Sequence, residues 1–176
     1  MPLRRAVSGS EEPFELSWEL FGELCRALAV KVGRDYEPEI VIGIAAAGVI
    51  PGAVIASMLR RDFYAMKITR RHDERIVRQR PEILSAAPAQ AEGRRVLLVD
   101  EICDTGETLR LALAAVRAVG PKEVRTATSL VRKGGYRPHY YALETDGIVI
   151  FPWDREVFEE GRLVLHPEYR DVLGAT

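Results

Sequence analysis

The run Val96–Val99 restricts the fold more than any other segment of the chain. It contains only apolar residues, and a strand without polar alternation is typical of a sheet that is covered on both faces. Two acids, Asp100 and Glu101, follow it directly. Gly106 and an apolar stretch that can form a helix, Leu109–Val119, come next. A strand, a turn and a helix in this order predict one unit of a parallel sheet.

Elements of these two kinds alternate along the chain up to Gly134. Short apolar runs predict strands, whereas apolar residues three and four apart predict helices, the first of which Ser17 can cap. The predicted strands are 40–45, 63–68, 95–100 and 124–131, and the predicted helices are 17–31, 52–60 and 105–119. The alternation predicts an α/β fold with a doubly wound, mainly parallel sheet flanked by helices, and it places ligands at the carboxyl ends of the strands.

Two segments do not follow this alternation. Residues 69–92 are charged, contain two prolines and lack periodicity, so we expect a mobile lid or binding loop there. Short apolar runs near the C-terminus predict a small, β-rich hood over the sheet. The predicted hood strands are 140–144, 148–151 and 163–166. We therefore expect one structural domain, with a core formed by residues 1–134, including an N-terminal helix, and a hood formed by residues 135–176.

The composition argues against several broad classes of protein. A chain of 176 residues suffices for one domain with one sizeable core. Its formal net charge of -1 argues against a general nucleic-acid binder, which is normally basic. No apolar run reaches the roughly 18 residues of a membrane span, and the N-terminus lacks the apolar core of a signal peptide. Cys25 and Cys103 form no paired framework, so we expect a reducing, cytoplasmic location without disulfides.

The residues after the central strand have the chemistry of a phosphate site. Backbone N–H groups at a helix start and the hydroxyls of Thr105 and Thr108 can hold a phosphate, and Gly106 lets a ligand approach closely. Asp100 and Glu101 would repel that phosphate unless they bind another part of the same ligand. Carboxylates accept hydrogen bonds from vicinal hydroxyls and bind hard cations such as Mg²⁺. The pattern therefore predicts a ligand with a phosphate at one end and a diol near a metal at the other, and a ribose 5-phosphate that carries a metal-bound diphosphate is such a ligand.

A purely structural role and the common nucleotide-binding motifs fit this segment less well. Solvated acids followed by a capped helix would account for each residue singly, but not for the acid pair, the glycine and both hydroxyls at one strand-to-helix turn. The chain also contains neither G-x-x-x-x-G-K-[ST] nor a G-x-G-x-x-G after a strand. The absence of both motifs argues against a nucleotide hydrolase and against a nicotinamide-dependent dehydrogenase.

Residues 96–109, VLLVDEICDTGETL, closely resemble the phosphoribosyl-pyrophosphate motif of the type I phosphoribosyltransferases, which join a nitrogenous base to ribose 5-phosphate. The resemblance extends in order and spacing over about residues 39–154. It implies the type I phosphoribosyltransferase fold, with Asp100 and Glu101 binding the ribose hydroxyls and Mg²⁺. Purine members commonly have Asp where Glu101 stands, and the longer side chain changes the reach of this acid. The residues that would wrap the 5-phosphate are Asp104, Thr105, Gly106, Glu107 and Thr108.

The stretch Gly43–Gly52, GIAAAGVIPG, matches the position of the family's pyrophosphate-binding loop, which is often Gly-Ile-x-Arg-Gly-Gly. Ala46 stands where an Arg is frequent and Ala47 where a Gly is frequent. The diphosphate would then be bound either by backbone N–H groups alone or with a basic group from elsewhere. A tight turn packed with small residues is the alternative interpretation. The predicted diphosphate contacts are Ala45, Ala46, Ala47, Gly48, Lys67 and Arg70, and further basic candidates are Arg71, Arg75, Arg78 and Arg80.

The C-terminal part is similar to the hypoxanthine-guanine and xanthine-guanine branch of this family. Arg132 and Lys133 end a predicted strand, and the sequence Phe151-Pro152-Trp153-Asp154 lies in the hood. In that branch a Lys recognises the purine 6-oxo group and an apolar side chain covers the ring. The match implies that Lys133 contacts the oxygen, and that Phe151 or Trp153 supplies stacking surface as the hood completes the base pocket. Arg132 is an alternative to Lys133 in this role. The structural alternatives are that Lys133 is merely solvated and that Trp153 packs in the core or in a dimer interface.

The resemblance implies a reaction of purine salvage. Phosphoribosyl pyrophosphate and a 6-oxopurine (guanine, xanthine or hypoxanthine) would give a nucleotide and diphosphate, with Mg²⁺ as cofactor. Asp104 would be the catalytic residue and accept the proton of the imidazole ring. We expect a cytoplasmic homodimer without nucleic-acid or membrane partners. Two alternatives stay open: a regulator of the same fold that binds phosphoribosyl compounds without catalysis, and a phosphoribosyltransferase for a pyrimidine base.

Overall fold

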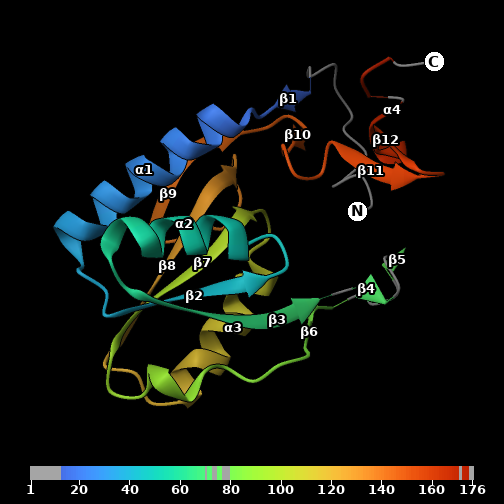
Figure 1. Ribbon diagram of the computed structural model, residues 1–176. Helices are drawn as coiled ribbons and strands as arrows, with labels where there is room; N and C mark the ends of the chain where they lie inside the picture. The colour runs from blue at the N-terminus through green and yellow to red at the C-terminus, as the bar shows by residue number, and fades with distance from the viewer. Residues whose placement is uncertain (1–12, 70, 73–74, 77–79, 171, 175–176) are drawn as a thin grey trace.

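The computed structural model describes residues 13–69, 71–72, 75–76, 80–170 and 172–174, and the side chains of these residues except those of 71–72 and 75–76. Its centre is a six-stranded sheet (Figure 1). In spatial order the strands are β6 (Glu82–Ile83), β3 (Asp62–Thr69), β2 (Ile40–Ala45), β7 (Arg95–Cys103), β8 (Glu123–Arg132) and β9 (Tyr140–Thr145). Every described pairing in this sheet is parallel except that between β3 and β6. The predicted doubly wound, mainly parallel α/β sheet is therefore confirmed.

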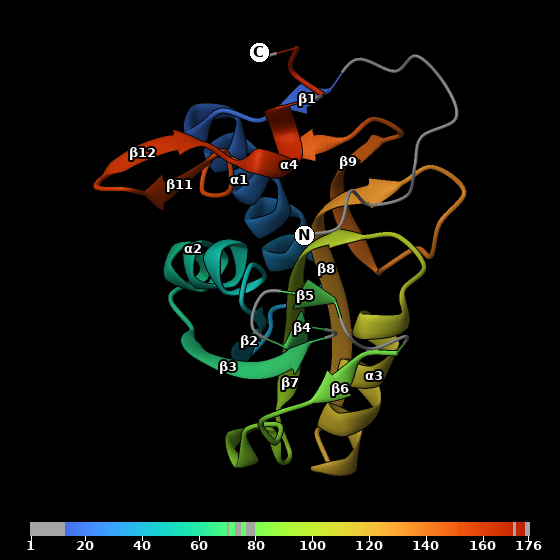
Figure 2. The same cartoon turned by 90° about the vertical axis from the view of Figure 1, so that its right-hand side faces the viewer.

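Helices cover both faces of the sheet (Figures 1 and 2). α1 (Trp18–Asp35) and α2 (Val49–Leu59) pack on one face, and α3 (Glu107–Ala118) packs on the other. α1 begins where the Ser17 side chain accepts a hydrogen bond from the N–H of Leu20 (3.1 Å), as the sequence predicted for this cap. Of the helices in the described ranges, none is long and apolar enough to cross a membrane.

The two central strands are buried on both faces. Val41 and Leu97 belong to the apolar cluster under α1 and α2, Ile42 and Leu98 belong to the cluster on the α3 side, and all four are fully buried. Neighbouring residues of one strand therefore face opposite cores. This arrangement explains why Val96–Val99 shows no polar alternation.

The C-terminal segment is less separate from the core than its sequence predicts. β9, which was expected in the hood, is instead an edge strand of the central sheet and pairs in parallel with β8. β10 (Val149–Ile150) pairs in parallel with β1 (Phe14–Glu15), so segments from opposite ends of the chain lie side by side. The periodicity of residues 140–144 identifies a strand but not its partner, because pairing depends on contacts between distant segments.

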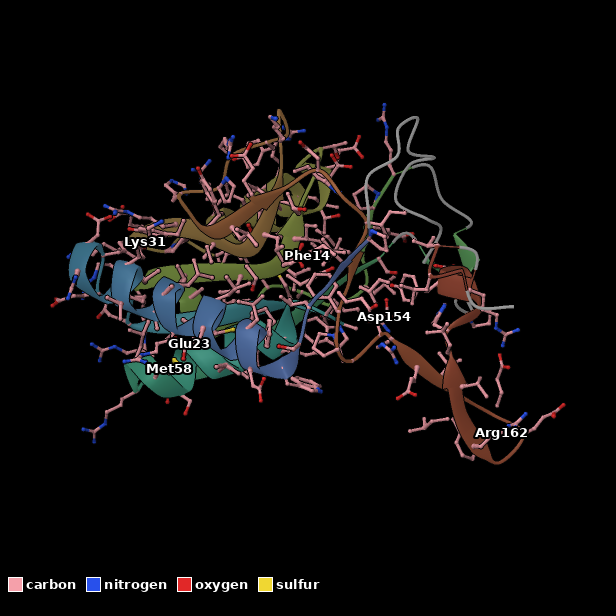
Figure 3. All side chains as sticks on the ribbon, turned by 90° about the horizontal axis from the view of Figure 1, so that it is seen from above. Phe14, Glu23, Lys31, Met58, Asp154 and Arg162 are labelled. Carbon is pink, nitrogen blue, oxygen red and sulfur yellow. The ribbon has the colours of Figure 1, made fainter. Side chains whose placement is uncertain are left out.

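The outer part of the hood is a hairpin. β11 (Glu156–Glu159) and β12 (Arg162–Leu165) pair in antiparallel fashion and project from the body of the molecule, with Arg162 near the outer end (Figure 3). α4 (Pro167–Arg170) follows. The sequence predicted β12 but not β11, which is only four residues long and rich in Glu. Of the predicted hood, residues 140–145 therefore belong to the central sheet, whereas the hairpin forms a separate two-stranded sheet.

Residues 69–92 contain more regular structure than expected. β4 (Arg71–His72) and β5 (Arg75–Ile76) form an antiparallel pair, and β6 runs antiparallel to the end of β3. A 3-10 turn, η1 (Ala89–Ala91), leads the chain towards β7. The mobility of this segment stays a prediction.

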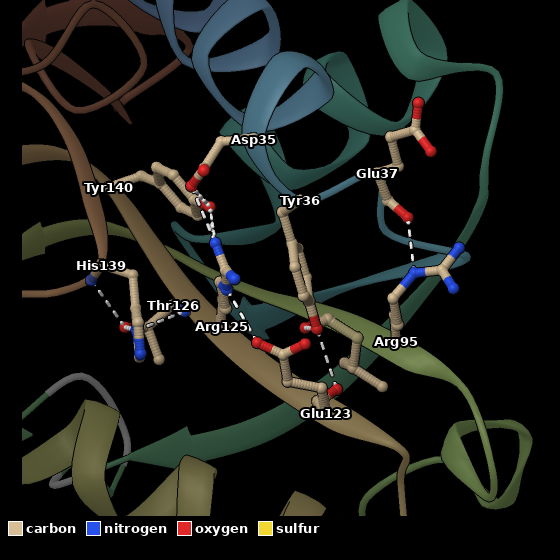
Figure 4. A network of polar contacts seen from close by, with 10 residues as sticks. Asp35, Tyr36, Glu37, Arg95, Glu123, Arg125, Thr126, His139 and Tyr140 are labelled. Carbon is tan, nitrogen blue, oxygen red and sulfur yellow. Dashed lines mark hydrogen bonds and ion pairs between the residues drawn. The ribbon is translucent and has the colours of Figure 1, made fainter.

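A polar network fixes the C-terminal end of α1 to the amino ends of the central strands (Figure 4). The Arg125 guanidinium donates to Asp35 Oδ2 (2.7 Å) and to Tyr140 Oη (2.6 Å), and it pairs with Glu123 (2.8 Å). The Tyr36 hydroxyl donates to the main-chain carbonyl of Glu123 (2.9 Å). This edge of the sheet is opposite to the carboxyl ends at which ligands are expected, so the network has a structural role.

Candidate active site

The predicted site residues gather at the carboxyl edge of the central strands. β2 ends in Ala45, β7 continues through Asp100 and Glu101, and β8 ends in Arg132. These strands are neighbours and run parallel, so their ends open onto one edge of the sheet. The fold thereby brings together residues that are far apart in the sequence.

Asp100 and Glu101 lie at the middle of this edge. Asp100 is 8% exposed and its Oδ1 accepts a hydrogen bond from the N–H of Glu101 (3.0 Å), whereas Glu101 is half-buried. The loop after β2 packs directly against the main chain of Val99 and Asp100, because a Cβ atom at Gly48 would lie 2.8 Å from Val99 O and 2.9 Å from Asp100 Cα. Only glycine fits there. The predicted diphosphate loop therefore lies against Asp100, one of the two predicted ribose-binding acids.

Asp100 and Glu101 have the donor chemistry of a magnesium site. Within the described residues, no group of three or more His, Cys, Asp and Glu side chains that could hold a metal ion is found. Asp100 and Glu101 are two consecutive carboxylates of β7. Mg²⁺ characteristically takes one or two carboxylates from a protein and its other oxygens from phosphates and water. The donor set therefore fits an ion that is bound together with a phosphorylated ligand.

The loop before α3 is longer than the sequence predicts. The helix begins at Glu107 rather than at Thr105, and Gly106 precedes it with a φ of +76°, a left-handed conformation that favours glycine. Arg110 N–H donates to Gly106 O (2.8 Å), and Thr105 Oγ1 accepts from Glu107 N–H (3.4 Å). The loop leads into the N-terminal end of a 12-residue helix, where the partial positive charge suits a phosphate.

Gly106 packs closely against another segment of the chain. A Cβ atom there would lie 2.4 Å from Cγ of Tyr136, so a tyrosine ring fills the open side of the glycine that was expected to face a ligand. The N–H of Tyr136 also donates to Asp104 O (2.8 Å). Sequence reasoning missed Tyr136, because it reaches the loop from the segment after β8 and no local pattern marks such a contact.

The alanine-rich segment forms the turn between β2 and α2. The Ala45–Ala46 peptide bond is cis, and α2 begins at Val49 rather than at residue 52. The N–H of Val49 donates to Ala46 O and the N–H of Ile50 donates to Ala47 O, both at 3.2 Å, so the turn leads directly into the helix. Since the turn itself contains only alanine and glycine, it offers a ligand main-chain groups and no charge of its own.

Lys67 stands beside this turn. β3 pairs in parallel with β2, which puts Lys67 opposite Ala45. Its side chain is exposed, while its main chain is held by Ser85, whose Oγ accepts from the N–H of Lys67 (2.7 Å). Arg80 is also exposed. Arg70 and Arg78 lie outside the described residues, as do the side chains of Arg71 and Arg75.

Arg132 and Lys133 have different environments at the end of β8. The Arg132 guanidinium donates to the main-chain carbonyls of Asp146 (2.6 Å) and Gly147, and so it holds the turn after β9. The Lys133 side chain is 73% exposed, with its Nζ 3.5 Å from Asp146 Oδ2. Of the two candidates for the base contact, Arg132 is occupied by a structural role and Lys133 is accessible.

Phe151, which was predicted to cover a base, has almost no accessible surface. Phe151 is 2% exposed, and its ring stacks on that of Trp153 with centroids 4.7 Å apart. Trp153 meets Phe21 edge-on (4.9 Å) and lies near Trp18 (5.9 Å), so the four rings join α1 to the C-terminal segment. Trp153 is half-buried in this cluster, in agreement with its core-packing alternative. Aromatic residues suit a core as well as a ligand site, and only their neighbours decide between the two.

Known proteins match the chain in both sequence and structure. A family model for the phosphoribosyl transferase domain matches residues 16–163. The purine phosphoribosyltransferase from Pyrococcus horikoshii Ot3 is similar in structure, with a TM-score of 0.72 and 27% identity over 85% of this chain and 99% of that chain.

Two curated relatives are similar in sequence. An orotate phosphoribosyltransferase from Parvibaculum lavamentivorans is 30% identical over 116 residues, which are 65% of this chain and 55% of that protein. An adenine phosphoribosyltransferase from Saccharopolyspora erythraea is 31% identical over 114 residues, 61% of this chain and 62% of that protein. The chain thus spans little more than half the length of these relatives. The family model covers most of the chain, and therefore the protein belongs to the phosphoribosyl transferase domain family, a family of glycosyl-transferring enzymes.

Proposed function

We propose that this protein transfers the 5-phosphoribosyl group from phosphoribosyl pyrophosphate to a 6-oxopurine and releases diphosphate. One observation carries the proposal: the acid pair of β7, the glycine-anchored turn before α2 and the loop before α3 meet at one edge of the sheet. The three parts suit the diol, the diphosphate and the 5-phosphate of a single ligand. The similar Pyrococcus horikoshii protein, which is a purine phosphoribosyltransferase, supports a purine as acceptor.

The sugar would be held from two sides. Asp100 and Glu101 would accept hydrogen bonds from the ribose hydroxyls and bind Mg²⁺, while Thr105, Thr108 and the start of α3 would hold the 5-phosphate. When bound, the ion neutralises negative charge on the departing diphosphate. The turn Ala46–Gly48 would donate its N–H groups to the diphosphate.

Lys67 would supply the positive charge that the turn itself lacks. It is exposed and lies opposite Ala45 in the sheet, so a diphosphate bound at the turn would lie beside its ammonium group. A positive charge at this point stabilises the charge that builds up on the leaving group. Arg70, which lies outside the described residues, is a second candidate for this role.

Asp104 and Lys133 would act on the base. Lys133 would donate to the 6-oxo group, and a ring nitrogen would form a bond to the anomeric carbon as the carbon–oxygen bond to diphosphate breaks. The electron pair of that bond goes to diphosphate, and the proton on the imidazole nitrogen passes to the Asp104 carboxylate. Closure of residues 69–92 would exclude water, which otherwise hydrolyses the activated sugar.

A panel of bases tests the proposal. The protein is incubated with phosphoribosyl pyrophosphate, Mg²⁺ and, in turn, guanine, xanthine, hypoxanthine, adenine and orotate, and both diphosphate and nucleotide are measured. We expect turnover with at least one 6-oxopurine. Turnover only with adenine or orotate, the bases named for the curated relatives, would support the proposed reaction but contradict a 6-oxopurine as the acceptor.

A regulator without catalysis is the second candidate. It is favoured by the alanines at positions 46 and 47, which leave the turn without a basic side chain. Such a protein would bind phosphoribosyl pyrophosphate in a calorimeter but release no diphosphate with any base. We also propose a homodimer, which light scattering after size-exclusion chromatography tests independently of turnover.

A further inference from the structure

Tyr136 packs against the back of the loop that precedes α3. The ring lies directly on Gly106, since a Cβ atom at that glycine would lie between 2.4 and 2.7 Å from three atoms of the tyrosine side chain. The N–H of Tyr136 donates to Asp104 O (2.8 Å). Gly135, just before it, approaches the same carbonyl so closely that its own Cβ would lie 2.6 Å from Asp104 O. Two segments that are distant in sequence thus touch through main chain and ring.

Arg110 completes this contact from the first turn of α3. Its guanidinium carbon lies 5.0 Å from the centroid of the Tyr136 ring, within the range of a cation–π interaction. The same guanidinium donates through Nη2 to Thr105 O (2.8 Å). Tyr136 therefore contacts Asp104 and Gly106, and Arg110 contacts Thr105 and Gly106. Each residue of the loop is held by at least one of the two.

The geometry points to Tyr136 as a positioning residue for the 5-phosphate and for Asp104. This inference rests on the proposed function, in which the loop Asp104–Gly106 wraps the phosphate. Gly106 has a positive φ and no Cβ, so its backbone is intrinsically free to adopt several conformations. The ring and the hydrogen bond restrict it to one before the ligand arrives, and a preorganised loop loses less conformational entropy on binding.

The turn that precedes Tyr136 also carries Lys133, the proposed contact to the base. Lys133 lies three positions before Tyr136, and the turn is closed by a hydrogen bond from Gly135 N–H to Arg132 O (3.0 Å). The contact with the loop before α3 therefore also sets the position of Lys133 relative to Asp104. Base and sugar phosphate are held by one connected unit of main chain.

Substitution of Tyr136 tests the role. In Tyr136→Ala we expect the dissociation constant of ribose 5-phosphate, measured by calorimetry, and the KM for phosphoribosyl pyrophosphate to rise about tenfold, the effect of a small displacement of a binding group. The kcat should fall less than KM rises. Tyr136→Phe keeps the ring and the main chain and should remain close to the wild type. Where Tyr136→Ala does not fold, Tyr136→Leu is measured instead, with the same expected direction.

Tyr141 provides a matched control. It is a half-buried tyrosine that packs against the same apolar cluster, with the Arg137 guanidinium 5.1 Å from its ring, but it contacts no residue of the loop before α3 among its described interactions. Tyr141→Ala should lower the melting temperature without changing the affinity for ribose 5-phosphate. Equal affinities for ribose 5-phosphate in Tyr136→Ala and the wild type would overturn the inference.

A double mutant makes the test specific for the contact. Gly106→Ala puts a Cβ atom against the Tyr136 side chain. Removal of the ring relieves the collisions with Cγ and Cδ1, but neither the collision with Cβ, which would lie 2.6 Å away, nor the cost of the positive φ. The loss of affinity caused by Gly106→Ala should therefore be smaller in Tyr136→Ala than in the wild type. Equal losses in the two backgrounds would contradict a direct contact. A wild-type protein that neither binds ribose 5-phosphate nor turns over would overturn the proposed function itself, and the role of Tyr136 with it.

Discussion

Glycine stands at two points of the site where any side chain would collide with another part of the protein. At Gly48 a Cβ atom would lie 2.7 Å from Ile44 O and 2.8 Å from Val99 O, and at Gly106 it would meet the Tyr136 ring. In both cases the neighbour is another segment of the protein. The small size of these residues therefore serves the contact between elements, and the ligand would use the shape that results.

The proposed role of Asp104 as the general base predicts that its substitution lowers turnover but not binding of the sugar phosphate. Asp104→Asn keeps the size of the side chain and the main-chain contact with Tyr136, but the amide cannot accept the proton of the base. We expect kcat to fall by about a hundredfold, which is within the range of lost general-base catalysis. The dissociation constant of ribose 5-phosphate should change little.

The control for this variant is Asp35→Asn, the same substitution at the opposite edge of the sheet. Asp35 pairs with Arg125 and Tyr140, so its loss should affect stability and leave kcat unchanged. Wild-type turnover in Asp104→Asn would exclude Asp104 as the base.

Single elements differ in how much their sequences reveal. β7 and α3 were predictable because a strand buried on both faces and an amphipathic helix each have their own local pattern. β9 was predictable as a strand but not as part of the central sheet. The segment around Phe151 was assigned to the base, whereas its rings join α1 to β10 and the residues beyond it.

The packing of the aromatic cluster predicts that a substitution at Phe151 changes the stability of the protein but not its recognition of the base. Phe151→Leu should lower the free energy of unfolding by about 1 kcal/mol, because the smaller side chain fits a fully packed site poorly. The KM for the base should not change. Denaturant unfolding and steady-state kinetics measure the two quantities.

Phe158→Leu is the matched control, since Phe158 is 73% exposed on β11 and its truncation should cost almost nothing. If Phe151→Leu raised KM for the base while unfolding stayed the same, the ring would belong to the base site after all.

At the scale of the whole molecule, the sheet separates two apolar clusters that are closed by different helices. Cys25 lies in the cluster under α1 and is fully buried, and Tyr36 links the end of α1 to the strands. Burial raises the pKa of the Cys25 thiol from its ordinary value of 9.0 to about 12. Burial and, to a smaller extent, the charge of Glu123 also raise the pKa of Tyr36.

The raised pKa values of these two groups predict that the free energy of unfolding falls at alkaline pH. A raised pKa means that the folded protein holds the proton more tightly than the unfolded chain does, so the contribution of Cys25 is complete below about pH 9 and is lost as the pH rises from there towards 12. The free energy of unfolding in urea should therefore fall over this range. In Cys25→Ala the fall should be smaller, because the thiol no longer contributes while Tyr36 and Tyr140, whose pKa values are also raised, still do. An identical pH dependence would contradict the assignment.

The sequence by itself determined the alternation of strands and helices, the position of Asp100 and Glu101 near the carboxyl end of a strand, which the structure extends to Cys103, and the turn before a helix that suits a phosphate. Such features depend on neighbouring residues and on the local periodicity of apolar side chains. The tertiary structure alone decided that Lys67 lies opposite Ala45, that Tyr136 fills the space beside Gly106, and that aromatic residues near the C-terminus close the core. These are contacts between separate segments. Burial of apolar surface favours any such contact without a preferred direction, so strand register and packing select the one that forms.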